Sequence, residues 1–375
     1  MRFLHTADLQ IGMTASGVGK LAKELQDARV ESLQAVLHIA AEKQVNFVVI
    51  AGDLFETNQV SPRYRQQVAG TLEGAKPLRV FILPGNHDYL GPNSVYQSEE
   101  FARLGPHITV FRERTPFVVP DLDLTFYPGP CFETRSHESP ARWIKKQIGT
   151  RYHVAVLHGS MPTVIGRTSD EDEYFPMLTD ELKALDMDYI ALGHWHSLYP
   201  DPATAGDSPF YYSGTPEPTG FGERKSGHAL LVEMDETVRR VTALPTAQFR
   251  FLDLEKEIKT GSDVEPLRKE LLDIPSPHKT LVRIKLGGII SISTREALDN
   301  LKVEIENRLA HIRFDDQSLL LEPDEADLGE FTKGGVAATT FAMLKKQRDQ
   351  APGPDREKYG RAIALAYKAF KGTLD

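Results

Sequence analysis

Five short polar motifs in the sequence contain residues that could bind metal ions. They are HTADLQIG at 5–12, GDLF at 52–55, GNHD at 85–88, the second histidine (His158) of YHVAVLHGS at 152–160, and GHWH at 193–196. Carboxylate and amide oxygens and imidazole nitrogens bind hard or borderline divalent metals. Two such ions about 3.5–4 Å apart can share a carboxylate and hold a phosphate between them. The motifs therefore predict these metal ligands: Asp8, Asp53, Asn86, His158, His194 and His196.

The spacing within the motifs suggests different roles for these residues. Asp53 is the natural bridging ligand, because it ends a buried strand and is held rigidly. His194 and His196 are two residues apart, so in an extended segment both point to the same side. His87 is the neighbour of Asn86 and cannot easily point the same way. It is better placed to face the substrate and to stabilise or protonate the leaving oxygen, so the predicted catalytic residues are His87 and Asp53.

Each motif alone has a simpler interpretation. A Gly-Asp pair after a strand is usually a turn, and a histidine that ends a strand, such as His158, is more often a satisfied polar residue than a ligand. The acidic run at 170–173 is interpreted as a solvated loop rather than as a third metal site. The occurrence of all five motifs in this order, each after a strand, favours a metal centre.

The segments that precede the motifs predict an α/β domain. Apolar runs predict strands at 2–7, 45–53, 78–86, 152–160, 187–196, 209–214 and 228–234. Apolar residues at helical spacing predict a helix at 20–43, and Pro62 suits the first turn of another. Ligand sites in layered α/β folds form at the carboxyl ends of the strands. Asp8, Asp53, Asn86, His158 and His194 each follow an apolar strand directly, so these residues are expected to meet.

From about Phe249 the sequence predicts a second, smaller α/β domain. Strand-like and helix-like segments alternate up to about residue 323, and two helices are predicted beyond it, at roughly 336–349 and from about Asp355. The expected domains are 1–248, 249–323 and 324–375. An apolar stripe on the last helix is predicted to bind a partner, through Tyr359, Ile363, Tyr367 and Phe370. Packing on the chain's own core is the simpler alternative.

Composition restricts the class of protein. The chain has 375 residues, 41% of them hydrophobic, which is enough for one large core and a smaller domain. The net charge of −9 does not favour binding of nucleic acid by the surface as a whole, although metal ions would return positive charge locally. Cys131 is the single cysteine, so no disulfide forms within the chain. No apolar run reaches the ~18 residues of a membrane helix, and a cytoplasmic location is expected.

At this point the motifs resemble those of the calcineurin-like metallophosphoesterases. HTADLQIG, AGDLFE, PGNHDY, LHGS and LGHWHS, followed by YYSGTPEPTGFGE, are similar to the DNA-repair exonuclease branch that includes SbcD and the Mre-eleven nucleases. The resemblance covers 1–245 and implies a layered β-sandwich flanked by helices. The segment 249–323 resembles the branch's DNA-capping domain in position and size, and the terminal helix pair resembles the segment that docks on an SbcC-type SMC-like ATPase.

The resemblance also implies two sets of ligands. One metal would be held by Asp8, Gln10, Asp53 and His196, and the second by Asp53, Asn86, His158 and His194. His87 would orient or protonate the scissile phosphate. The family implies two divalent ions, manganese first and magnesium or iron as alternatives, with DNA as substrate and a homodimer as the assembly.

Gln10 departs from the family's D-x-H pattern. Its amide oxygen can bind manganese or magnesium, but it is a weaker donor than imidazole toward transition metals. A weakened or more metal-selective enzyme is therefore expected. Two alternatives remain open at this stage: a phosphodiesterase for nucleotides or other small esters, and a non-catalytic subunit that binds DNA or regulates a partner.

Overall fold

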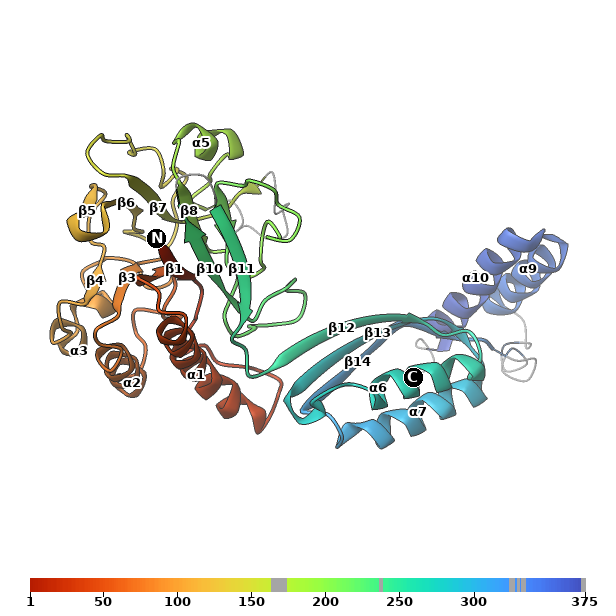
Figure 1. The fold of residues 1–375 in the computed structure, drawn as a ribbon. Helices are drawn as coiled ribbons and strands as arrows, with labels where there is room; N and C mark the ends of the chain where they lie inside the picture. The colour runs from red at the N-terminus through yellow and green to blue at the C-terminus, as the bar shows by residue number, and fades with distance from the viewer. Residues whose placement is uncertain (163–173, 236–238, 324–327, 329–330, 332–334, 372–375) are drawn as a thin grey trace. The chain divides into compact units, whose positions relative to one another are not determined.

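The computed structural model divides into two compact units, Met1–Arg250 and Phe251–Asp375. It describes residues 1–162, 174–235, 239–323, 328, 331 and 335–371, and the acidic run at 170–173 lies outside these ranges. The first unit has an α/β fold built on two sheets, and the second has a smaller sheet with helices (Figure 1). None of the helices in the described ranges is long and apolar enough to cross a bilayer.

Two sheets form the centre of the first unit. The first has the order β11-β10-β1-β2-β3-β4, with bounds Arg239–Pro245, His228–Met234, Arg2–Thr6, Phe47–Ala51, Arg79–Leu83 and Ile108–Val110. The second has the order β5-β6-β7-β8-β9, with bounds Phe117–Val119, Leu124–Gly129, Tyr152–His158, Tyr189–Gly193 and Phe210–Tyr212. Strands β1 to β4 are parallel to one another, and so are β6 to β9. Their carboxyl ends therefore form one edge on each sheet.

Aromatic and β-branched side chains from both sheets form the core between them. Phe47 of β2 stacks on Phe3 of β1 with ring centroids 4.7 Å apart, and it meets Phe126 of β6 edge-on at 5.3 Å. Every residue of β2 is fully buried, as the continuous apolar run predicted. Full burial of one such phenylalanine stabilises the fold by roughly 1.5–3 kcal/mol. This core fixes the positions of the strand ends that carry the motifs.

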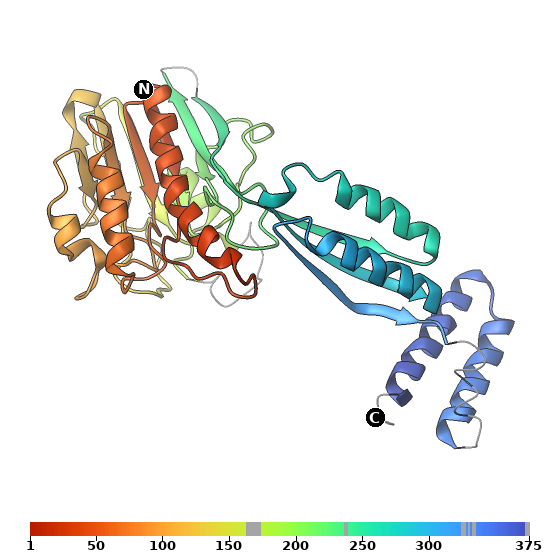
Figure 2. The same cartoon turned by 90° about the horizontal axis from the view of Figure 1, so that it is seen from below.

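Helices cover the outer face of the first sheet. Helix α1 spans Leu21–Glu42 and α2 spans Pro62–Glu73, with the proline in the first turn as expected. Leu33 and Val36 of α1 pack with Val48 and Ile50 of β2 in one cluster. Figure 2 shows α1 and α2 side by side over this sheet. The shorter helices α3 (Glu99–Ala102) and α5 (Thr179–Ala184) lie in connections.

The sequence did not predict β4, β5, β6 or β11. Strand β6 was missed because its segment LTFYPG ends in Pro128 and Gly129, which usually mark a turn. In the structure this segment is fully buried and pairs with β7 in parallel. Sheet pairing on a central strand overrides the local turn preference.

The second unit contains three strands and two packed helices. The order is β12-β13-β14, with bounds Arg250–Glu257, Thr280–Ile290 and His311–Leu321. Helices α6 (Val264–Leu272) and α7 (Ile292–Glu306) supply apolar residues to a separate core that includes Leu267, Leu298 and Ile284. The alternation of strands and helices predicted for 249–323 is confirmed element by element.

Helices α9 (Val336–Gln350) and α10 (Gly353–Lys371) form a pair at the end of the chain. Ile363 and Tyr367 of α10 are buried in a small core with Phe331 and Phe341, and the Phe370 ring lies 5.7 Å from that of Phe341. Most of the stripe predicted to bind a partner therefore packs inside the helix pair. The stripe thus packs on the chain's own core, which was the alternative to binding a partner.

Candidate metal centre

The residues of the five motifs come together at the carboxyl ends of parallel strands. Asp8 and Asp53 follow β1 and β2, and Asn86 follows β3 of the same sheet. His158 is the last residue of β7, and His194 follows β8 in the second sheet. The facing sheets therefore bring together residues that are up to 186 positions apart in the sequence.

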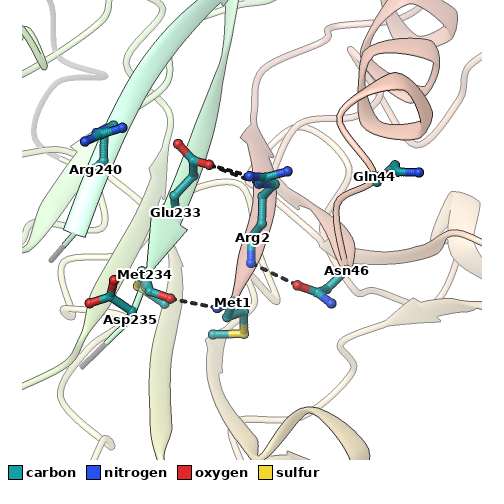
Figure 3. A pocket seen from close by; sticks show the side chains of 8 residues that line it. All are labelled: Met1, Arg2, Gln44, Asn46, Glu233, Met234, Asp235 and Arg240. Atoms are coloured by element: carbon teal, nitrogen blue, oxygen red, sulfur yellow. Dashed lines mark hydrogen bonds and ion pairs between the residues drawn. The ribbon is translucent and has the colours of Figure 1, made fainter. Parts of the chain in front are cut away.

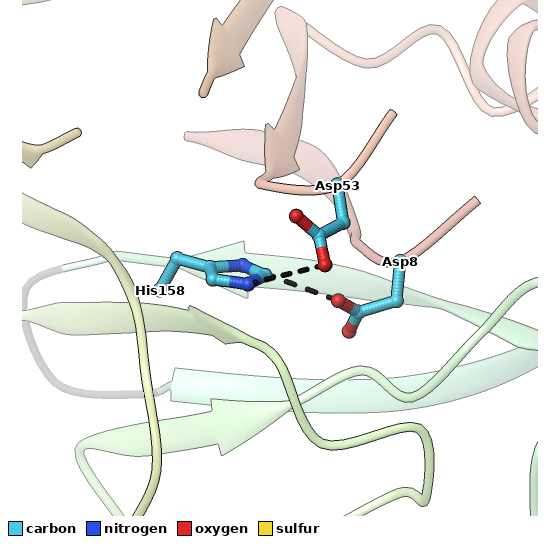
Figure 4. A group of neighbouring side chains, drawn as sticks. All are labelled: Asp8, Asp53 and His158. Carbon is cyan, nitrogen blue, oxygen red and sulfur yellow. Dashed lines mark ion pairs between the residues drawn. The ribbon is translucent and has the colours of Figure 1, made fainter. Parts of the chain in front are cut away.

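Asp8, Asp53 and His158 form the centre of this cluster. Each offers one ligand atom, and these atoms all lie within 4.8 Å of one another. Figure 4 shows the two carboxylates and the imidazole pointing toward one another. His158 Nε2 is 3.4 Å from Asp53 Oδ2, and all three side chains are buried. A cluster of two carboxylates and an imidazole suits a divalent cation.

Asn86 and His194 extend the cluster. The Oδ1 atom of Asn86 is 2.8 Å from His158 Nε2 and 3.1 Å from His194 Nδ1. His158 Nδ1 lies 3.0 Å from the carbonyl oxygen of Ala51 and donates its hydrogen there, so Nε2 faces Asn86 and Asp53. Asn86 Oδ1 can accept a hydrogen bond from either ring nitrogen, and a metal cation bound by these groups would take the place of the proton on His158 Nε2. The donor set thus fits a metal ion.

The charges of these groups support the same conclusion. Burial alone would lower the pKa of His158, but the negative charge of Asp53 and its hydrogen bond raise it to about 9. Burial raises the pKa of the Asp8 carboxyl to about 6. Burial would also raise the pKa of Asp53, yet His158 holds it well below its ordinary range. The buried carboxylates are thus balanced by a proton on His158, and a metal cation can take the place of that proton.

Gln10 lies beside the proposed bridging ligand. Its Nε2 donates a hydrogen bond to Asp53 Oδ2 at 3.0 Å. Its Oε1 is buried and has no hydrogen-bond partner in the described structure. A buried amide oxygen without a partner is costly, and a bound cation would satisfy it. The position of Gln10 therefore fits a ligand despite the departure from D-x-H.

His196 is oriented by residues that sequence reasoning missed. Its Nδ1 lies 2.9 Å from Thr219 Oγ1 and 3.4 Å from Glu223 Oε1. Such partners fix the ring and leave Nε2 as the atom available to a metal. Thr219 and Glu223 belong to the stretch TPEPTGFGE, which was noted in the sequence but given no role.

His87 is held apart from the ligand cluster. Its backbone N–H donates to Asp53 Oδ1 at 3.0 Å, and its ring Nδ1 is 3.0 Å from the carbonyl oxygen of Glu56. Burial lowers the pKa of His87, but the charges of Asp53 and Glu56 raise it overall above its ordinary value. A half-buried imidazole with a raised pKa beside a metal centre can donate a proton or stabilise developing negative charge.

The profile of the calcineurin-like phosphoesterases matches residues 1–198. The chain belongs to this family. As a member, it is a phosphoesterase of the hydrolase class that uses divalent metal ions, and its mixed α/β fold is that of the family.

Individual relatives are distant. An uncharacterized metallophosphoesterase, YhaO of Bacillus subtilis (strain 168), is 25% identical over 207 residues, which cover 52% of this chain and 48% of YhaO. The DNA double-strand break repair protein Mre11 of Methanococcus maripaludis is 23% identical over 301 residues, covering 74% of this chain and 76% of that protein. Mre11 of Methanopyrus kandleri is 26% identical over 263 residues, covering 63% and 54%. The chain thus spans about half the length of two of these three relatives.

In this phosphoesterase, Asp88 braces the motif loops, a role that sequence reasoning also missed. Its buried carboxylate accepts hydrogen bonds from the N–H of Gly85 at 2.7 Å, the N–H of Phe55 at 3.1 Å and the hydroxyl of Tyr96 at 2.6 Å. These bonds join the GNHD loop to the GDLF loop. The relative position of Asn86 and Asp53 therefore depends on Asp88.

The backbone at the phosphoesterase centre is strained. Asp8, Gln10, Asp53 and His194 have φ values of 55°, 50°, 52° and 100°, in the left-handed region. Each such residue costs roughly 1–3 kcal/mol, and such residues concentrate at functional sites. Gly85 is required for close approach, because a Cβ there would lie 2.1 Å from Asp53 Oδ1.

A separate cavity of about 500 Å³ lies at the other end of β1 (Figure 3). Its lining includes Arg2, Asn46 and Glu233, and an ion pair of 2.8 Å joins Arg2 to Glu233. The metal cluster lies beyond the carboxyl end of the same strand. This cavity is therefore not part of the phosphoesterase site.

Proposed function

We propose that this phosphoesterase hydrolyses DNA with two metal ions. One ion would be held by Asp8, Gln10, Asp53 and His196, and the other by Asp53, Asn86, His158 and His194. The observation that supports the two-metal assignment is the cluster of Asp8, Asp53 and His158 ligand atoms within 4.8 Å of one another, together with the partnerless Gln10 Oε1. The proposed metal is manganese, with magnesium or iron as alternatives.

The chain's own residues then perform the following steps. Metal ions bound there would polarise the phosphate and activate water. Asp53 would be the ligand that both ions share, and hydrogen bonds from His87 N–H and Gln10 Nε2 position its carboxylate. His87 presents its free ring nitrogen to the substrate and gives a proton to the leaving oxygen. The burial of Asp8, Asp53 and His158 strengthens the electrostatic interactions of these groups.

The choice of DNA as substrate has two supports. Two relatives carry the name DNA double-strand break repair protein. The chain also continues past the matched residues 1–198 into a second unit with its own core, which a small-molecule esterase does not need. We propose that 249–323 caps the DNA and that the protein acts as the SbcD-like nuclease subunit of a homodimer with an SbcC-type ATPase.

The C-terminal segment 324–375 is proposed to dock on that ATPase. Because Ile363 and Tyr367 are buried inside the helix pair, the docking contact is assigned to its outer surface. That surface carries the exposed apolar side chains of Val336, Met343 and Leu365. The stripe of α10 would then act by holding the two helices together.

A metal titration with two substrates tests the proposed function. We expect purified protein to cleave linear DNA in manganese, with activity that rises and saturates as the metal is added. Bis(4-nitrophenyl) phosphate serves as the small phosphodiester. Rapid cleavage of this ester without cleavage of DNA would favour the small-molecule alternative, and no cleavage of either would favour the non-catalytic subunit.

Gln10→His is expected to tighten the first metal site by about 10- to 100-fold, or about 1.4–2.8 kcal/mol. Imidazole is a better donor to manganese than an amide oxygen. The φ of 50° at this position is one that histidine tolerates more readily than most residues. Calorimetric titration of manganese into both proteins measures the change.

The second site provides the internal control for Gln10→His, because its ligands Asn86, His158 and His194 are unchanged. Its affinity should stay constant. Identical titration curves for both sites would mean that Gln10 does not bind metal. Weaker binding in the variant would mean that the surrounding residues are adapted to glutamine.

A further inference from the structure

Arg29 is a buried arginine on the face of α1 that packs on the first sheet. It lies one and two turns before Leu33 and Val36, which belong to the core between α1 and β2. Only 4% of Arg29 is exposed, and its Nη1 is buried without a hydrogen-bond partner in the described part of the chain. Arginine is almost never fully buried unless its charge is compensated. The position of Arg29 in an apolar helix face therefore needs an explanation.

Three glutamates compensate the charge of Arg29. Burial lowers the pKa of the guanidinium, and three carboxylates oppose that shift, in decreasing order Glu217, Glu223 and Glu56. Glu217 is 1% exposed and the side chain of Glu223 is 11% exposed, so water screens these charges little. Arginine keeps its proton throughout the physiological pH range. The guanidinium is thus a permanent countercharge, without which the three carboxylates would repel one another.

Two of these glutamates belong to the loop at 215–223, which holds His196. The N–H of Thr215 donates to the carbonyl of His196 at 3.1 Å. The carboxylate of Glu223 lies 3.4 Å from His196 Nδ1, and its two oxygens each accept from the N–H of Thr219 at 3.1 Å. The loop therefore fixes both the backbone and the ring of this proposed metal ligand.

Glu217 anchors the same loop to the segment that follows β11. Its Oε2 accepts from the N–H of Gln248 at 2.6 Å, and its Oε1 accepts from the N–H of Phe249 at 2.8 Å. The carboxylate that most strongly attracts Arg29 is thus itself held in place by the backbone. Arg29 therefore attracts the loop toward α1 at two carboxylates, one of which orients His196.

The ligands proposed for the second metal are oriented by other groups. The carbonyl of Ala51 fixes the ring of His158, and Asn86 Oδ1 lies between the rings of His158 and His194. A change in the charge of Arg29 should therefore act on the two metal sites unequally.

We propose that Arg29 is a positioning residue for the first metal site, and that it acts through Glu223 on His196. This inference rests on the proposed function, since it requires the two separate ligand sets. Arg29 touches neither metal nor substrate. Its charge balances the carboxylates of the loop at 215–223, so that Glu223 stays against His196 and the ring keeps Nε2 available to the metal.

Calorimetric titration of manganese into Arg29→Met tests this role. The variant keeps an unbranched apolar side chain in the helix but removes the charge. Affinity at the first site should fall by about 10- to 100-fold, the usual effect of losing a group that orients a metal ligand, while the second site stays close to wild type. Arg29→Lys retains the charge and should recover most of the affinity. An equal loss in Arg29→Lys would overturn a role for the charge.

Glu223→Gln shows whether Arg29 acts through this carboxylate. It should weaken the first site to a similar extent, and adding Arg29→Met to it should cause little further loss. Glu223→Gln leaves α1 unchanged, so it also decides the question if Arg29→Met does not fold. Wild-type affinity of the first site in Glu223→Gln, or fully additive losses in the double variant, would overturn the proposal.

Arg65→Met is the matched control. Arg65 lies on α2, its side chain is 24% exposed, and its Nε is 3.4 Å from a carboxylate oxygen of Glu100. Its replacement should leave both manganese affinities unchanged. Wild-type affinities in folded Arg29→Met, or an equal loss at both sites, would overturn the role of Arg29 while leaving the two-metal assignment of the wild-type protein intact. If the wild-type protein binds no manganese, the proposed function itself fails.

Discussion

Asp53→Asn is expected to reduce DNA hydrolysis by about 1,000-fold or more. The substitution keeps the shape of the side chain but removes the charge and one of the two oxygens. Both proposed metal sites share this carboxylate, so one ion would lose its ligand oxygen and the other would keep only a neutral amide oxygen. A loss of 1,000-fold corresponds to about 4 kcal/mol of transition-state stabilisation. Initial rates in manganese and metal content after dialysis measure the two effects.

Asp123→Asn is the control for this substitution. Asp123 has a φ of 49°, close to the 52° of Asp53, but its carboxylate accepts a hydrogen bond from Arg151 N–H away from the centre. The control isolates metal binding from the backbone conformation that the two residues share. Asp53→Asn with wild-type rates and metal content would mean that this carboxylate does not bridge two ions.

His87→Gln is expected to lower kcat by about 100- to 10,000-fold, the range of a lost general acid. Metal content and KM should stay close to wild type, because the ring of His87 contacts the Glu56 carbonyl rather than the ligand cluster. The raised pKa of His87 means that more of its ring is protonated at neutral pH than in an ordinary histidine. Steady-state kinetics and bound metal separate the two roles.

His107→Gln provides the comparison for His87→Gln. His107 is also half-buried, and its Nε2 lies 3.1 Å from the carbonyl of Leu72, but it precedes β4 at the amino end of the strand. Its replacement should leave kcat unchanged. A parallel loss of metal and activity in His87→Gln would make His87 a ligand rather than a proton donor.

Some features of the site need contacts that no local pattern encodes. The sequence assigned no role to Asp88, the last residue of GNHD. Its hydrogen bonds with Phe55 and Tyr96 form only when the loops come together in the fold. Glu223 orients His196 from 27 residues further along the chain, through a loop without regular structure. Loops of this kind carry no periodicity from which contacts could be predicted.

The sequence also left open whether the apolar stripe on α10 binds a partner or packs on the chain's own core. Helical spacing defines which residues share a face, and it correctly grouped Ile363 with Tyr367. It does not define what covers that face. The aromatic rings of Phe331 and Phe341 cover it in the structure, so the stripe serves the helix pair.

The sequence by itself determined the family fold and the order of the metal-binding motifs. Buried parallel strands are encoded as continuous apolar runs, and polar residues directly after them must emerge at one edge of a sheet. Tertiary structure alone decided how the polar atoms are oriented. The Ala51 carbonyl that fixes the His158 ring is 107 residues away, and the Asn86 oxygen it faces is 72 residues away. Such orientations depend on pairs brought together by packing, and the order of residues along a chain does not record them.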